Sequence, residues 1–188
     1  MTITDSEVAI DLDLPPDFHE VPFGPSVEDR VFGQSQILDR LHIADPAHRE
    51  GLGWYLEALS RGVSEGAVAG TAFCAVRLDG APSTATITVA THPAASDDPL
   101  VFVLGACRTF RDSGRYEAVQ HERLGRTLAA VASGATANAR NLTIAVPVPG
   151  HRTGVVLMLS TTDTAHTVVY EQVARDAAAS VRVPAPRS

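Results

Sequence analysis

Seven histidines are the side chains of this sequence best suited to acid–base or metal chemistry near neutral pH. None of them stands in the HExxH or HxH spacing that brings two ligating groups together on one element. His42 and His48 are six residues apart across an expected helix start, so they need not share a face. The pattern favours solvated or capping histidines, and a metal site built from distant histidines is the alternative. The seven are His19, His42, His48, His92, His121, His151 and His166.

The segment 115–123 carries alternating charged residues, which a strand would divide between its two faces. Glu117, His121 and Arg123 then share one side of the strand with Val119. Surface ion pairs explain this pattern, and a catalytic pair of Glu117 with His121 is the alternative. Because no nucleophile is marked beside that pair, we predict no catalytic residues here.

Motifs of common catalytic and cofactor sites are absent from the sequence. There is no GxSxG turn for a nucleophilic serine and no GxGxxG turn for a dinucleotide. All 15 basic residues are arginine, which excludes Schiff-base chemistry and a phosphate-loop lysine. The run Ser-Thr-Thr-Asp at 160–163 is typical of a helix cap, although the same N–H groups could hold an anion. We therefore predict a protein that is not an enzyme and has no cofactor or metal site.

Length and charge limit the organisation of the chain and its partners. A chain of 188 residues with 45% hydrophobic residues fits one globular domain. We expect a flexible N-terminus at 1–7, a single α/β domain at 8–183 and a C-terminal tail at 184–188. The net charge of −7 disfavours binding to nucleic acid and to an anionic membrane.

The compartment is predicted from the N-terminus and the cysteines. The first seven residues include two acids and no basic residue, and no apolar run reaches the roughly 18 residues of a membrane span. Cys74 and Cys107 both lie in apolar segments, which predicts small buried side chains with reduced thiols. A disulfide or redox pair is the alternative. We expect a cytoplasmic protein.

Strands dominate the expected secondary structure. The predicted turns between neighbouring strands are short, with Asp79-Gly80 the clearest, so most pairs should be antiparallel. The small-residue segment 134–140 is expected to be a mobile loop, and residues 31–41 are either a short helix or a loop. The expected strands cover residues 8–14, 69–78, 83–91, 115–124, 127–133, 141–148, 154–161 and 180–183.

Three helices are expected to cover the sheet, each with an apolar stripe facing inward. The first begins at Asp45-Pro46, the second at Asp97-Asp98-Pro99 and the third after the cap Thr162-Asp163-Thr164. The fold class is thus α+β, with a mostly antiparallel sheet of about 6–8 strands covered by two or three helices. The expected stripes are Leu52, Leu56, Leu59 and Val63; Leu100, Val103, Leu104, Cys107 and Phe110; and Val168, Val169, Val173 and Ala177.

Three C-terminal segments, residues 144–150, 154–161 and 174–183, carry a family resemblance. They resemble the final hairpin, helix and strand of PsbP-like domains, and proteins of the actinobacterial LpqN type look most similar. Residues 10–18 are similar to the first strand of those domains. The resemblance implies a PsbP-like α/β sandwich and a non-catalytic role in binding or assembling other proteins. It brings no catalytic residues with it.

We therefore predict a non-enzymatic protein-interaction, assembly or accessory domain of a high-GC bacterium, whose partner is another protein or a second copy. One alternative is a small-molecule-binding protein or enzyme with a cleft between sheet and helices, lined by His121 with Glu117 or Arg123. Another is a structural subunit of a larger bacterial assembly. Phe18, Val21 and Phe23, which lie between prolines, are expected to pack over the sheet edge, and a partner surface is the alternative. The candidate partner contacts are Phe18, Val21, Phe23, Trp54, Tyr55, His151 and Arg152.

Overall fold

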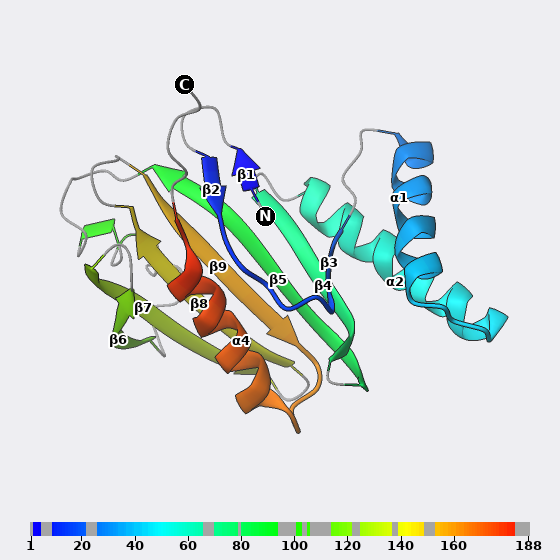
Figure 1. Cartoon of the computed structure of the whole chain (residues 1–188). Helices are drawn as coiled ribbons and strands as arrows, with labels where there is room; N and C mark the ends of the chain where they lie inside the picture. The colour runs from blue at the N-terminus through cyan, green and yellow to red at the C-terminus, as the bar shows by residue number, and fades with distance from the viewer. Residues whose placement is uncertain are drawn as a thin grey trace.

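Figure 1 shows the computed structural model of the chain. The backbone of strands β6 and β7 is described, but their side chains are not. The described residues are 2–4, 9–21, 26–65, 70–78, 80–93, 101–102, 105, 114–121, 125–136, 139–148 and 153–182.

The fold is built on a seven-stranded sheet in which every neighbouring pair is antiparallel. This confirms the predicted α+β class, and the strand number lies within the predicted range. β9 inserts between β5 and β8, so the last strand joins the two halves of the sheet. In spatial order the strands are β3 (Phe18–Glu20), β4 (Gly70–Leu78), β5 (Ala81–Pro93), β9 (Thr153–Thr161), β8 (Ala139–Pro147), β7 (Gly125–Thr136) and β6 (Gly114–His121).

A second, two-stranded sheet lies at the N-terminus. β1 (Thr2–Thr4) pairs antiparallel with β2 (Ala9–Asp11), although the sequence predicted no strand within residues 1–7. The expected final strand at 180–183 is reduced to a single bridge between Arg182 and Asp11. These contacts bring the two ends of the chain side by side.

Two of the described helices form a hairpin between β3 and β4. α1 (Val27–Arg40) settles the open question at 31–41 in favour of a helix, and Ser26 Oγ caps it by accepting the N–H of Asp29 at 3.0 Å. α2 (Pro46–Glu65) begins where Asp45-Pro46 predicted, with Asp45 Oδ1 accepting the N–H of Ala47 at 3.1 Å. The third helix, α4 (Thr167–Ser180), follows β9.

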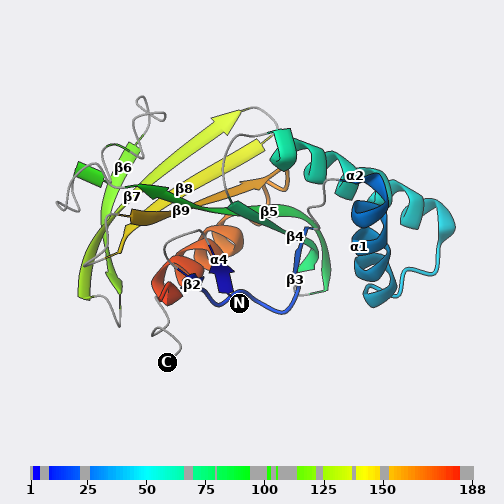
Figure 2. The same cartoon turned by 90° about the horizontal axis from the view of Figure 1, so that it is seen from above.

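The helices cover opposite faces of the sheet, as Figure 2 shows from above. Alternation along β4 sends Phe73 and Ala75 toward α4 and sends Ala72 and Cys74 toward α1 and α2. Strand β5 buries Ala85, Ile87 and Val89 on the α4 side. One sheet thus supports two separate apolar cores.

The predicted inward stripe of α4 is wrong in part. Val168 and Val169 are 80% and 42% exposed. The buried face instead consists of Tyr170, Ala174, Ala177 and Ala178, and Val173 is partly buried beside it. The buried face thus combines one large side chain, Tyr170, with small alanines, while two branched valines at the start of the helix face solvent.

Two further segments, residues 134–140 and 100–110, also had predicted structures. The predicted mobile loop at 134–140 is instead the end of a hairpin, because Gly134 pairs with Asn141 and Thr136 with Ala139. The apolar stripe predicted at 100–110 lies outside the described residues. Helical Phe102, which was not in that stripe, is buried against Gly154.

Candidate functional site

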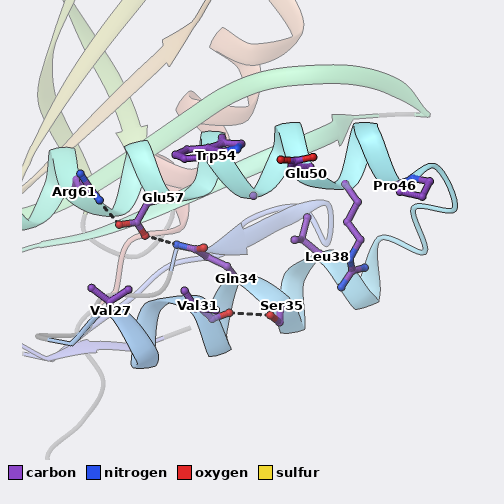
Figure 3. A pocket seen from close by; sticks show the side chains of 12 residues that line it. Val27, Val31, Gln34, Ser35, Leu38, Pro46, Glu50, Trp54, Glu57 and Arg61 are labelled. Atoms are coloured by element: carbon purple, nitrogen blue, oxygen red, sulfur yellow. Dashed lines mark hydrogen bonds and ion pairs between the residues drawn. The ribbon is translucent and has the colours of Figure 1, made fainter.

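An open groove of about 560 Å³ runs between the outer surfaces of α1 and α2. We call this surface the α1–α2 face, and Figure 3 shows its side chains. Because the groove is open to solvent rather than enclosed, its walls are available to a large partner. It is lined by Val27, Val31, Gln34, Ser35 and Leu38 of α1, and by Pro46, Arg49, Glu50, Gly53, Trp54, Glu57 and Arg61 of α2.

The helical period explains why this face carries apolar side chains. Each helix already buries another stripe, with Ile37 of α1 and Leu56 of α2 packed against β4. Residues of the second stripe therefore point away from the sheet. Val27, Val31 and Trp54 in this stripe are 59%, 50% and 71% exposed. Phe32 is also exposed on α1, outside the groove lining.

A charged cluster lies at one end of the groove, around the carboxylate of Glu57. Arg30 Nη2 and Arg61 Nε donate to Glu57 Oε1 at 3.2 and 2.9 Å, and Gln34 Nε2 donates to Oε2 at 2.8 Å. The hydrogen bonds from Arg30, Arg61 and Gln34 lower the pKa of Glu57 from 4.5 to about 2. Glu57 is therefore ionised at neutral pH and ties α1 to α2.

Two polar side chains on this face, Ser35 and Glu57, are engaged by hydrogen bonds within the chain. Ser35 Oγ donates to the Val31 carbonyl at 2.9 Å. The Glu57 carboxylate accepts hydrogen bonds from three residues, so it is a poor proton acceptor. Across the described part of the chain, no three His, Cys, Asp or Glu side chains lie close enough to hold a metal ion.

A second pocket of about 320 Å³ lies where α1 turns into α2. His42 and His48, which the sequence did not place together, both line it, with Asp45 between them. His42 follows the end of α1 with a φ of 50°, and its Nδ1 lies 2.7 Å from the Arg40 carbonyl. This left-handed conformation is typical of the residue after a helix, so His42 ends α1.

The predicted partner contacts fall in different environments. Phe18 and Val21 are buried, which places both side chains in the cores rather than on the surface. Trp54 is exposed on the α1–α2 face. Phe23, His151 and Arg152 lie outside the described residues.

Tyr55, the remaining candidate, has a structural contact. Its hydroxyl donates to the Thr84 carbonyl at 3.1 Å and so joins α2 to β5. Burial raises the pKa of Tyr55 to about 12, which keeps the phenol neutral.

The alternative catalytic pair of Glu117 with His121 lies on strand β6. The side chains of Glu117 and His121, and all of Arg123, lie outside the described part of the structure. His19 is described, and burial together with the nearby Arg40 lowers its pKa, which favours a neutral imidazole.

Sequence reasoning missed most of the groove. Val27, Val31 and Gln34 belong to a segment with no firm prediction, and Glu57 and Arg61 were not singled out. One usable signal existed: Val27 and Val31 are four residues apart, as are Glu57 and Arg61, the spacing of helical neighbours.

Comparison with known proteins finds a loose likeness only. No protein-family model matches the sequence, and no curated protein matches it. A Bacteroides thetaiotaomicron crystal structure has 7% identity and a TM-score of 0.47, covering 94% of this chain and 45% of that one. LpqN of Mycobacterium tuberculosis, described as involved in cell envelope biogenesis, has 11% identity and a TM-score of 0.46, covering 94% and 83%. The Saccharomyces cerevisiae Ran-binding protein Mog1p has 10% identity and a TM-score of 0.40, covering 61% and 78%.

This chain spans less than half the length of the Bacteroides protein. At these TM-scores the likeness is one of general architecture, and we draw no functional conclusion from it. Within the described residues, no helix combines the length and the apolar character that crossing a membrane requires.

Proposed function

We propose that this chain is a non-enzymatic interaction or accessory domain that binds a protein through the α1–α2 face. One observation carries the proposal: Trp54 is 71% exposed beside an open groove flanked by exposed Val27 and Val31. Clustered apolar side chains on a surface typically mark a binding site. Tryptophan and arginine dominate the energetic centres of protein interfaces, and Trp54 and Arg61 line the same groove.

The shape of the groove supports a protein over a small molecule. Small-molecule sites usually enclose most of their ligand, whereas this groove is open between two helices. A helix or a row of side chains from another protein can lie along it.

Charge supports the same class of partner. The net charge of −7 opposes binding to nucleic acid or to an anionic membrane. The free, buried Cys74 fits a reducing compartment, and we keep the cytoplasm as the proposed location. Kinship with PsbP-like domains is likewise a proposal, which rests on the C-terminal sequence pattern.

Photo-crosslinking of the full chain tests the docking surface. A photoreactive phenylalanine derivative, which keeps an aromatic ring at position 54, replaces Trp54 in one protein and replaces Val168 in a control, because Val168 is also exposed but lies on α4. In lysate of the native host, position 54 should give protein adducts that Val31→Asp abolishes, while position 168 should give none. Absence of adducts from position 54, or equal adducts from both positions, would contradict the proposal.

A further inference from the structure

The two helices of the α1–α2 face run antiparallel, and two ion pairs between them mark the ends of the groove. Asp39 of α1 is paired with Arg49 of α2 at 2.6 Å close to the turn between the helices, and we call this the turn end. Arg30 of α1 is paired with Glu57 of α2 at 3.2 Å toward the other end, which we call the far end. The α1 residues that line the groove span about three helical turns, or roughly 16 Å, between the two ends.

Carboxylates outnumber guanidinium groups at both ends of the groove. At the far end three acids stand against two arginines, because the first turn of α1 adds two acidic residues to Glu57. At the turn end two acids stand against one arginine. Arg40 and Asp45 lie at the turn between the helices, and their opposite charges cancel. The charged residues counted are Glu28, Asp29, Arg30, Glu57 and Arg61 at the far end, and Asp39, Arg49 and Glu50 at the turn end.

Two of these carboxylates are available to a partner. The side chains of Glu28 and Glu50 are exposed and have no hydrogen-bond or ion-pair partner in the part of the chain that the structure describes. The other acids are engaged: Asp29 accepts a hydrogen bond from Ser26 Oγ at 2.7 Å, and the remaining two are held by arginines. A partner that approaches the groove therefore meets one free carboxylate at each end.

The two free carboxylates lie on one diagonal of the groove. Glu28 is at the far end of α1, seven residues before Ser35, so the helical period places it on the same side of α1 as that groove-lining residue. Glu50 lines the α2 wall at the turn end, and Arg61 lines the same wall at the far end, as Figure 3 shows. One diagonal of the groove thus carries two carboxylates, and the other carries an arginine.

We propose that the α1–α2 face binds an amphipathic helix of another protein, which carries two basic side chains on opposite sides of its apolar stripe. This inference rests on the proposed function, which requires only that the face bind a protein. The apolar stripe of the partner lies along the groove against Val27, Val31 and Trp54. Its two basic side chains, about three turns apart, reach Glu28 at one end and Glu50 at the other.

The fit does not depend on the direction in which the partner helix runs. Turning the helix end for end within the groove brings each basic side chain to the position that the other one occupied. A helix with its basic side chains on the opposite diagonal is mismatched in both directions, because one of them meets Arg61 instead of Glu28. The position of the two charges therefore determines the fit, whereas the net charge of the partner does not.

Titration of the full chain with three synthetic helical peptides tests the inference. Two of them share one composition and one leucine stripe, and their two lysines lie on the matching diagonal in the first peptide and on the opposite diagonal in the second. The third peptide has glutamate in place of both lysines of the first. All three lack tryptophan, so a shift in the emission of Trp54, the single tryptophan of the chain, reports burial of the face. The matching lysine peptide should bind about threefold to tenfold more tightly than its isomer, and the glutamate peptide should bind most weakly.

Three substitutions assign the selectivity to the two free carboxylates. Glu28→Gln and Glu50→Gln should each weaken binding of the matching peptide about threefold and narrow its advantage over the isomer. Neither carboxylate has a partner within the chain, so both variants should keep the fold, which circular dichroism checks. Glu171→Gln is the matched control, because it removes the same charge from α4 on the opposite face of the sheet and should leave the binding of both peptides unchanged (Figure 2).

The outcomes separate this inference from the proposed function. If no lysine peptide shifts the Trp54 emission up to near-millimolar concentration, the helical occupant is overturned, and adducts from position 54 to another protein would leave the docking function in place. Equal binding of the two lysine peptides, or tighter binding of the glutamate peptide, overturns the charged diagonal. A Trp54 emission that shifts with protein concentration in the absence of peptide identifies a second copy as the occupant and also overturns the inference.

Discussion

The hydroxyl of Tyr170 donates a hydrogen bond of 3.0 Å to Asp163 Oδ2 and so ties the first turn of α4 to the segment after β9. The same oxygen lies 2.7 Å from His166 Nδ1, and Asp163 Oδ1 accepts the N–H groups of Ala165 and His166. Hydrogen bonding, with His166 the largest contributor, lowers the pKa of Asp163. The predicted cap at 162–164 is therefore wrong in part: the N-cap residue of α4 is His166, which makes no side-chain cap hydrogen bond, and Asp163 instead holds the turn that leads into the helix.

Removing the Tyr170 hydroxyl should destabilise the fold. Tyr170 is 2% exposed, so Tyr170→Phe keeps the packed ring but loses the hydrogen bond to Asp163. The expected loss in the free energy of unfolding is about 1 kcal/mol by urea denaturation. Val168→Ala on the same helix is the control and should change this value by less than about 0.5 kcal/mol, because Val168 is exposed. Equal effects of both variants would contradict a role for the hydroxyl.

Protonation of Glu57 should weaken the α1–α2 hairpin in acid. Its pKa is about 2 in the folded chain and 4.5 as the ordinary value, so between these values the unfolded chain binds more protons. The stability that ionised Glu57 contributes is therefore complete above pH 4.5 and is lost as the pH falls toward 2. Thermal unfolding across this range should show a smaller fall for Glu57→Gln than for the wild-type protein. Parallel pH curves for the two proteins would refute this assignment.

Adding a methyl group at Gly154 should be costly. A Cβ there would overlap the ring of Phe102, which covers the sheet face opposite α4. Gly154→Ala should lower the free energy of unfolding by about 1–3 kcal/mol, as overpacked cores usually do. The cost should shrink when Phe102→Leu is already present, and a double-mutant cycle measures this coupling.

Gly51 offers the matched control for that experiment. It lies in α2 with no atom within 4 Å of an added Cβ. Gly51→Ala should raise stability by up to about 1 kcal/mol, because alanine favours a helix over glycine. The two Gly→Ala changes are therefore expected to have opposite signs, and a loss at Gly51 as large as at Gly154 would contradict the packing argument.

The Cys74 thiol should be inert in the folded protein. It is fully buried between β4 and the α1–α2 hairpin, and burial raises its pKa to about 12. Only the thiolate reacts readily with disulfide reagents, so reaction requires unfolding. In a Cys107→Ser background, Cys74 should react at once in denaturant and only at the unfolding rate without it. Rapid reaction of the native protein would show that the α1–α2 hairpin opens.

Local sequence pattern predicted most of the sheet. The period of two in residues 83–91 identified β5, and Asp79-Gly80 identified its hairpin with β4, where Gly80 has a φ of 81°. The pattern failed where contacts are not local. Segment 134–140 looked like a loop because its residues are small, yet pairing of Gly134 with Asn141 extends β7 and β8 there.

The candidate site was harder to predict than the fold. Trp54 was singled out because it lies beside the predicted inward stripe of its helix and not in it. Phe18 and Val21 had two interpretations, as core residues over the sheet edge and as partner contacts, and their burial confirms the first. An apolar residue type favours burial, but only the neighbouring elements of the fold determine whether its side chain is buried.

The sequence alone determined the fold class, because alternating and helical apolar spacing dictates an antiparallel sheet with covering helices. Tertiary structure alone decided which side of each helix is covered. The sheet buries one apolar stripe of α1 and one of α2. The second stripe, which includes Val27, Val31 and Trp54, is therefore left exposed. That leftover stripe, which no local pattern distinguishes from the buried one, forms the candidate site.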